Sequence, residues 1–247
     1  QQVAALRLVA CGISPLVTHP LAVVERDQAS EVARGAQFLM FLPYMLIIGA
    51  FMGGMYLAID TTAGERERQS LEPLLATPVA RESIISAKIL ATAVFSLLSI
   101  AVTLIAYRLA FAIVPARGVD ASFDPEPAGL LQLFLIILPV VLLGATVLTA
   151  LAAFARSYRE AQGYLPLLMF LPMIPSLVLM VAPVRTQLWM LAVPFLGQNQ
   201  MIVRVLRSER ISALDWGVSL GASFAVVAVV WWIAARLYHR EQLATSS

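Results

Sequence analysis

Five long runs of apolar residues divide the chain, and each is long enough to cross a membrane as an α-helix. A helix needs about 20 mostly apolar residues to span about 30 Å of hydrocarbon. The runs are apolar throughout rather than alternating, which argues against the strands of a β-barrel. The sequence therefore predicts an all-α, polytopic membrane protein. Its five expected spans are Ala36–Ile59, Ile89–Val114, Gly129–Phe154, Tyr164–Pro183 and Leu214–Leu237.

The connections between these runs differ in character. Asp60–Lys88 is charged and much longer than a simple connection requires. Val184–Ala213 holds apolar segments that are too short and too charged to cross, which indicates re-entrant or interfacial helices. Pro115–Ala128 is expected to be a solvated loop, and Ala155–Gly163 is a short connection. Residues 1–35 are mixed in character, and their pattern predicts no particular structure.

The composition excludes the classes of protein that work in water. Of the 247 residues, 60% are hydrophobic and 13% are charged, whereas soluble proteins have about 45–50% and about 25%. The net charge of +2 comes without a basic block, which argues against a nucleic-acid partner. Cys11 is the one cysteine, so the sequence allows no intrachain disulfide and no cysteine-based metal site.

The arginines and the single lysine do not orient the spans. If Asp60–Lys88 lies inside, eight basic residues fall on each side of the membrane, so the positive-inside rule gives no clear answer. Giving more weight to short loops favours Asp60–Lys88 and Ala155–Gly163 inside.

Two pairs of glycines are spaced for close helix packing. Gly49 and Gly53 lie in the first expected span, and Gly217 and Gly221 lie in the last. Small residues let two backbones approach and gain van der Waals contact inside lipid. Packing within one chain and contact with a second chain are both consistent with this spacing.

The Asp60–Lys88 segment predicts two short helices. Thr62 and Glu65 fit a capping box, and Glu65 with Arg68 and Arg68 with Glu72 are spaced to pair on one helical face. An apolar patch of Leu71, Leu74 and Leu75 follows at helical spacing. Thr77 and Pro78 then fit the N-cap and first residue of a second helix that continues into the next span. The first helix either rests on lipid headgroups or docks into a groove of a soluble partner.

This segment resembles the coupling helix of ABC-2 type exporter permeases, most closely the sodium-exporting NatB-type branch. The resemblance rests on Gly64–Arg68, Ser70–Val79, Arg81 and Lys88. Pro194–Asn199 with Ser208 and Glu209, and Ala235–Tyr238 with Arg240 and Glu241, are similar to later parts of the same family. Gln69, Ser83 and Ala87 depart from the family pattern, in which glycine, an acid and glycine are usual.

The resemblance implies a partner, a partner surface and a topology. A separate ATPase subunit would bind ATP and Mg²⁺, and a second permease copy or homologue would complete the transporter in the bacterial plasma membrane among its lipids. The loop and the C-terminus would be cytoplasmic. Gln1–Gly35 would be the tail of an external domain that follows an earlier span, both outside this chain. The ATPase would dock on Glu65, Arg66, Glu67, Arg68, Ser70, Leu71, Glu72, Leu74, Leu75, Thr77 and Pro78.

The sequence contains no chemistry of its own for ATP hydrolysis. It lacks a G-x-x-x-x-G-K-[ST] phosphate loop, an H-E-x-x-H metal motif and a G-x-S-x-G nucleophile elbow, so no cofactor or metal site is expected in this chain. Arg108 near the outer end of a span either snorkels to headgroups or lines a pathway. Asp60 at a span edge either marks the boundary or handles cations. Thr146 and Ser176 are further candidates for lining a pathway.

The function expected from the sequence is that of a transport subunit rather than an enzyme. The subunit would export Na⁺ or a lipid-like amphipathic substrate by alternating access, driven by the separate ATPase. No carboxylate is expected at mid-membrane, so the sequence does not favour Na⁺ over an amphipathic molecule. The alternative is a membrane scaffold that holds a soluble partner through the 60–88 segment without transport.

Overall fold

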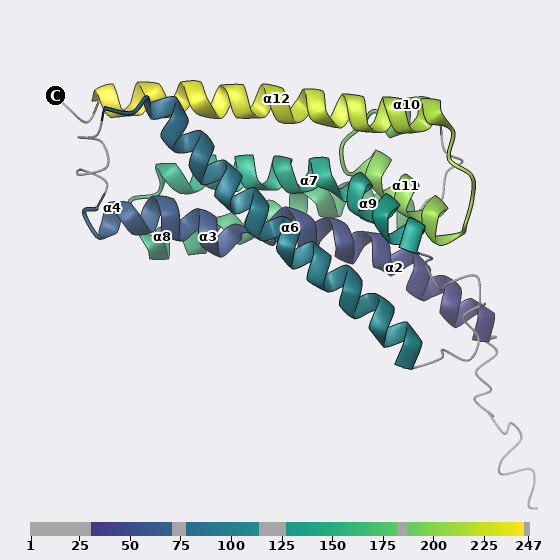
Figure 1. Ribbon diagram of the computed structural model, residues 1–247. Helices are drawn as coiled ribbons and strands as arrows, with labels where there is room; N and C mark the ends of the chain where they lie inside the picture. Colours follow the sequence, from purple (N-terminus) through teal and green to yellow (C-terminus); the bar gives the residue numbers. More distant parts are fainter. Residues whose placement is uncertain (1–30, 71–77, 114–126, 182–186, 245–247) are drawn as a thin grey trace, which may run out of the picture. The chain divides into compact units, whose positions relative to one another are not determined.

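The computed structural model describes residues 31–70, 78–113, 127–181 and 187–244, which belong to one compact unit that begins at Glu31. Most of these residues are helical, with no strand among them, which confirms the all-α fold class (Figure 1). Five helical stretches in these ranges are long and apolar enough to cross a membrane. They are Phe41–Glu67, Glu82–Leu109, Ala128–Phe154, Tyr158–Leu179 and Ala213–Leu237. Of the expected tail Gln1–Gly35, residues 1–30 lie outside the described part, and the last five, for which no particular structure was predicted, are helical and begin the first helix at Glu31.

The first spanning stretch is longer and less regular than expected. Helix α2 (Glu31–Met52) ends in a turn, after which α3 (Met55–Ile59), the π-helix η2 (Asp60–Gly64) and α4 (Glu65–Glu67) continue the stretch. The prediction that Thr62 caps a new helix is therefore wrong. The Thr62 hydroxyl instead donates to the Ala58 carbonyl at 2.5 Å, four residues earlier. A threonine that bonds backward in this way sits inside a helix, because its carbonyl target belongs to the preceding turn.

The second and third spans form long continuous helices. Helix α6 runs Arg81–Ile113 and α7 runs Pro127–Phe154. Pro78 does not occupy the first helical position, because the Ala80 carbonyl accepts the first helical hydrogen bond, from Ile84 N–H at 3.3 Å. The expected helix that leads into the second span exists, but it begins at Arg81. Thr77, its expected N-cap, lies outside the described residues.

The fourth and fifth spans follow tight connections. Only residues 155–157 separate α7 from α8 (Tyr158–Tyr164), whose first turn is capped by the Ser157 hydroxyl, which accepts from Glu160 N–H at 3.2 Å. Most of the expected Ala155–Gly163 connection is therefore helical. The 3₁₀ turn η4 (Leu165–Met169) and α9 (Phe170–Val181) continue this span, and α12 (Ala213–Ala244) forms the last.

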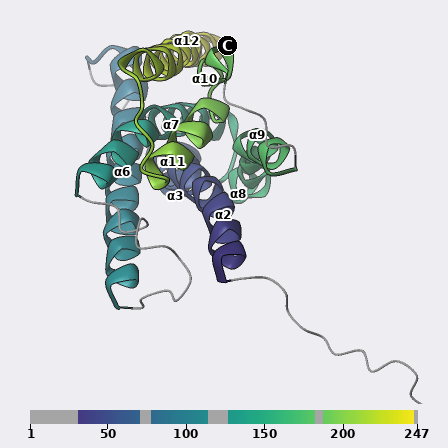
Figure 2. The ribbon, with the colours of Figure 1, turned by 90° about the vertical axis from the view of Figure 1, so that its right-hand side faces the viewer.

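Helix α7 lies at the centre of the packing. It contacts α2, α3, α6, α11 and α12 (Figures 1 and 2). Its buried side chains include Leu133 and Ile137, which belong to the same core cluster as Phe51 of α2. Gly144 allows this approach, because a β-carbon there would lie 2.8 Å from the Phe51 α-carbon. The core is thus built on a close backbone contact between the first and third spans.

Two short helices precede the last span, as the sequence predicts. Helix α10 (Leu188–Leu191) is followed by α11 (Leu196–Leu206), which packs against α2 and α7. The Phe195 ring meets the Phe51 ring edge-on at 5.5 Å between centroids. Helix α11 therefore packs into the bundle of described helices. The buried Gln198 side chain holds α11 in place, since it accepts from Phe195 N–H and donates to the Ser223 hydroxyl, both at 2.6 Å.

The outer faces of the helices are apolar. On α6, exposed side chains recur along one side, among them Leu90, Leu98 and Ile105. On α12, Trp232 is exposed and carries the Arg236 guanidinium 3.9 Å from its ring centroid. Exposed aliphatic faces of this size suit hydrocarbon, and aromatic and basic side chains gather where a span leaves it. These faces support a multi-pass membrane protein.

Candidate functional site

Charged residues gather where the first two spans meet the 60–88 segment. We call this end of the bundle the loop end, and we call the charged group the loop-end clasp. It consists of Asp60, Glu65, Arg66, Glu67, Arg68 and Lys88, together with the backbone groups of Thr61, Ala155 and Tyr158 that they bind.

Lys88 of α6 joins the second span to the first. Its ammonium group donates to Glu65 Oε2 at 2.5 Å and to the Thr61 carbonyl oxygen. The Lys88 side chain is 9% exposed and that of Glu65 is 28% exposed, so the pair is shielded from water. A charge-assisted contact in such surroundings is stronger than one at the surface. Lys88 therefore fixes the loop end of α6 to the helix of the first span.

The next two residues join the first span to the connection between the third and fourth. Arg66 Nη1 donates to the Ala155 carbonyl at 3.2 Å, and Glu67 Oε2 accepts from Tyr158 N–H at 2.8 Å. Both partners lie at a chain reversal, where backbone groups lack helical partners. One helical turn of the first span thus binds the ends of all three neighbouring spans.

Small buried residues bring these helices close enough for the clasp to form. A separate core cluster at this end contains Ala58 and Ala63 of the first span, Ala152 of α7, Ala155 directly after it, and Ala161 of α8. Methyl-sized side chains let helices approach within a membrane and gain van der Waals contact. The alanines position the backbones, and the charged side chains then complete the contact.

The Glu65–Arg68 pair that local spacing predicts does not form. Glu65 pairs with Lys88 rather than with Arg68, and Arg68 instead donates to Asp60 Oδ1 at 2.6 Å. A shielded lysine from another span competes better for a carboxylate than an exposed arginine one turn away. The Arg68–Asp60 pair is 65% and 45% exposed, so it adds little to stability.

The helix of the first span ends at the clasp. Gln69 has φ 57°, Ser70 N–H donates to the Glu65 carbonyl and Gln69 N–H donates to the Arg66 carbonyl. These two bonds make a Schellman motif, in which the left-handed residue is usually glycine. The predicted amphipathic helix does not continue through Gln69, because the chain turns there, and the expected Arg68–Glu72 pair involves a residue outside the described part. Leu71, Glu72, Leu74, Leu75 and Thr77 lie outside the described residues.

Gln69→Gly is expected to stabilise the protein. Glycine adopts positive φ without the clash of a β-carbon, and we expect a gain of about 0.5–1 kcal/mol after the greater freedom of the unfolded chain is subtracted. The measurement is the thermal unfolding midpoint in detergent. Ser70→Gly is the control, since Ser70 has no positive φ and should gain nothing. A lower midpoint for Gln69→Gly would contradict this account of the turn.

The structure does not bring the pathway candidates together. Asp60 is paired at the loop end, while Arg108 lies near the far end of the second span, about 30 Å along α6 from Lys88. The buried Thr146 hydroxyl donates to Leu142 within its own helix at 2.7 Å. Ser176 lies in α9, and its side chain is not described. Among the described residues, no group of three or more His, Cys, Asp or Glu is placed to hold a metal.

The two glycine pairs differ in their surroundings. A β-carbon on Gly53 would lie 3.6 Å from the Ser96 backbone, so this glycine packs against α6. Gly217 and Gly221 have no described neighbour within 4 Å. The described residues therefore give the second pair no packing partner, and its role in helix packing stays a prediction. The sequence analysis missed Gly54 and Gly144, whose close contacts no spacing pattern marks.

Lys88 belongs to the loop-end clasp, but it was not among the residues predicted to meet the ATPase. It is the chain's only lysine and lies 23 residues after Glu65. Its isolation among arginines and apolar residues was a signal in the sequence. A compact ammonium group with three donors can serve a carboxylate and a carbonyl at once.

Comparison with known proteins places this geometry in context. A family model described as "ABC-2 family transporter protein" matches residues 15–236. The "ABC transporter permease protein NatB" of Bacillus subtilis (strain 168) is 26% identical over 235 residues, which cover 93% of this chain and 60% of that protein. The chain therefore spans less than two thirds of this relative's length. No solved structure gives a significant match.

Proposed function

The chain belongs to the ABC-2 transporter family, and from this premise we propose that it is the membrane-spanning permease part of an ATP-driven exporter. It would bind a separate ATPase subunit and pair with a second permease, and it would not hydrolyse ATP itself. ATP and Mg²⁺ would stay on the ATPase. The residues proposed to meet that ATPase lie in and beside the 71–77 segment, next to the loop-end clasp.

The clasp is the observation that carries this proposal. An ATPase that moves the segment after Ser70 would pull on a helix end bonded to Lys88, Ala155 and Tyr158. Rigid helices transmit such a displacement along their whole length, because the helices of a packed bundle move as rigid units and do not deform smoothly. The clasp would thus turn one docking event into a joint movement of four spans.

The proposal includes an orientation. The loop end, with Glu65–Arg68 and the C-terminal end of α12, would face the cytoplasm of a bacterial cell, where ATP is available. The far end, which carries α10 and α11, would face outward. An accessibility assay on single cysteines tests this: with Cys11 replaced, Ser70→Cys should react with a membrane-impermeant maleimide only in inverted vesicles.

Changing Leu71 and Leu74 to aspartate is expected to remove the ATPase from the purified complex. Two carboxylates would have to enter an apolar groove, so we expect at least about a 100-fold loss of affinity. The measurement is mild-detergent purification of the full-length protein from its own cells, with mass spectrometric identification of what copurifies.

Leu214→Asp is the matched control for this experiment. Leu214 is 57% exposed in the first turn of α12, at the far end. This variant should keep the ATPase. Copurification that survives in the Leu71 and Leu74 variant would contradict the docking surface. A stable partner without a phosphate-binding loop would contradict the exporter and favour a membrane scaffold.

A further inference from the structure

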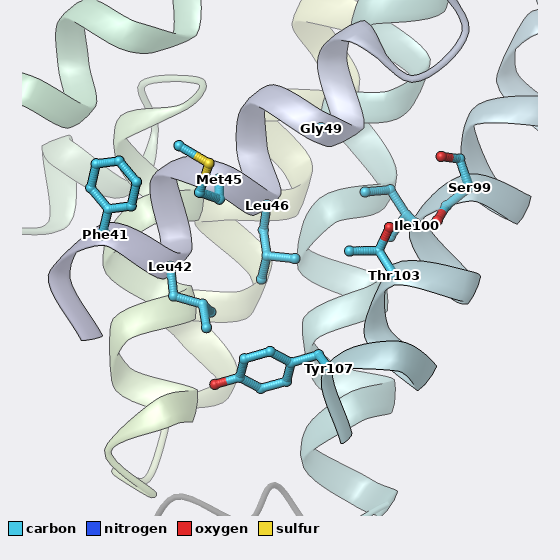
Figure 3. A pocket seen from close by; sticks show the side chains of 9 residues that line it. All are labelled: Phe41, Leu42, Met45, Leu46, Gly49, Ser99, Ile100, Thr103 and Tyr107. Carbon is cyan, nitrogen blue, oxygen red and sulfur yellow. Dashed lines mark hydrogen bonds between the residues drawn. The ribbon is translucent and has the colours of Figure 1, made fainter. Parts of the chain in front are cut away.

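A cavity opens between the first and second spans, on the half of the bundle away from the clasp. It has a volume of about 250 Å³ and lies between α2 and α6 (Figure 3). Leu42, Met45, Leu46 and Ile100 are among the apolar residues of its wall, and Gly49 leaves space at its upper side. An engineered apolar cavity of about 150 Å³ takes up benzene, so this one has room for a hydrocarbon segment.

The polar groups of this cavity are few. Ser99 and Thr103 lie along the α6 side, and the Tyr107 ring lies across its foot (Figure 3). The Thr103 hydroxyl donates to the Ser99 carbonyl at 2.8 Å, so it is engaged within its own helix. No carboxylate is among the described residues that line the cavity. A hard cation needs several oxygen ligands around it, and this lining does not provide them.

The position of the cavity connects it to the clasp. The first span and α6 are bonded at the loop end through Glu65 and Lys88. Midway, they touch closely, since a β-carbon on Gly54 would lie 2.5 Å from the Ser96 hydroxyl oxygen. Beyond this contact α2 and α6 separate, as Figures 1 and 2 both show, and the cavity fills the space. A movement at the loop end would pivot on the Gly54 contact and change the width of the cavity.

From these observations we propose that the cavity binds the hydrocarbon chain of the exported substrate, which is therefore an amphipathic molecule. This inference rests on the proposed function and specifies its substrate class. The side chains at the mouth support it. Phe41 is 47% and Met45 48% exposed on a spanning helix, so the cavity is reached from the lipid rather than from water. A hydrocarbon chain that enters this cavity from the lipid has no hydration shell to lose.

A photoreactive fatty acid tests the proposal. The probe is a palmitate analogue with a diazirine in its chain, added to the full-length protein in phosphatidylcholine vesicles. We expect saturable labelling of the segments around Met45 and Thr103, competed by unlabelled palmitate. Gly49→Leu should lower this labelling about tenfold, because its side chain displaces about two methylene groups of the ligand.

The controls separate a blocked cavity from a damaged protein. Thr103→Leu narrows the cavity from α6 and should reduce labelling as well. Gly163→Leu is the same change at a helical position where a β-carbon would have no described neighbour within 4 Å, and it should label like the parent. Labelling that does not saturate, or that is equal in the parent and in Gly49→Leu, would overturn the proposal. Equal labelling by a phosphatidylcholine probe would overturn it too, since the occupant would be resident lipid.

The result of the photolabelling experiment does not depend on whether an ATPase binds the permease. Photolabelling needs no partner, so failure to copurify an ATPase would contradict the exporter and leave the ligand site standing. If the reconstituted complex exported Na⁺ and Gly49→Leu did not reduce this export, the amphipathic substrate class would be overturned while the exporter stood.

Discussion

Lys88→Met is expected to uncouple the ATPase from the permease. The variant leaves the Glu65 carboxylate and the Thr61 carbonyl without their shared donor, in surroundings where the lysine is 9% exposed. Loss of one partner from a buried pair costs about 3–5 kcal/mol, and the partial exposure of Glu65 brings our expectation to about 2–3 kcal/mol. The first span would then move without the second. The measurement is the ATPase activity of the reconstituted complex and its stimulation by substrate, which should be lost.

Two further variants test the cause of this effect. Arg159→Met also removes a positive charge at the loop end, but Arg159 is exposed and forms no ion pair with a described residue, so coupling should persist. Adding Glu65→Gln to Lys88→Met removes the unpaired charge, and the double variant should be more stable than the sum of the two single changes predicts. Strict additivity would show that Glu65 and Lys88 do not form the contact described here.

Gly144→Ala is expected to destabilise the whole bundle. The added methyl group would overlap the backbone carbonyl of Phe51 and lie 2.8 Å from its α-carbon, and a backbone cannot turn aside as a side chain can. Overpacking of this kind costs about 1–3 kcal/mol, and here it would force apart the first and third spans. The measurement is the fraction of protein that stays monodisperse on gel filtration after heating in detergent.

The same glycine-to-alanine substitution at Gly163 is expected to raise the stability of the protein rather than lower it. Gly163→Ala adds a methyl group where no described atom lies within 4 Å, so only helix propensity changes, by about 1 kcal/mol in favour of alanine. A Gly144→Ala variant as stable as the parent would show that α2 and α7 do not approach as closely as the structure has them.

In the loop-end clasp, the sequence pattern predicted where a charged site lies but not which residues pair within it. Four charged residues in a row after an apolar run indicated a site, and that inference needed no structure. Their partners were predicted wrongly because the i, i+3 rule describes an isolated helix in water. In the bundle, Lys88 and the backbone of Ala155 and Tyr158 come within reach, and contacts shielded from water outcompete exposed ones.

The helix boundaries show the same limit. Thr62 followed by Glu65 matches a capping box, but a threonine hydroxyl can also bond to a carbonyl one turn earlier within a continuing helix. The first span continues through Thr62 because its own Ala58 and Ala63 and the facing Ala152 of α7 are small, which lets the helix run on against α7. Gln69 ends it by a turn that usually takes glycine, which is the residue usual at this position in the family that the segment resembles.

The sequence by itself determined the all-α membrane fold and its five spans, because hydrocarbon admits only long apolar helices with internally satisfied backbones. It also showed that these 247 residues contain no phosphate-binding loop of the G-x-x-x-x-G-K-[ST] type. Only the tertiary structure decided which charges pair, where the first span bends and ends, and that α2 and α6 part to leave a cavity. These features depend on contacts between residues far apart in the chain, and no local pattern encodes the distance between two helices.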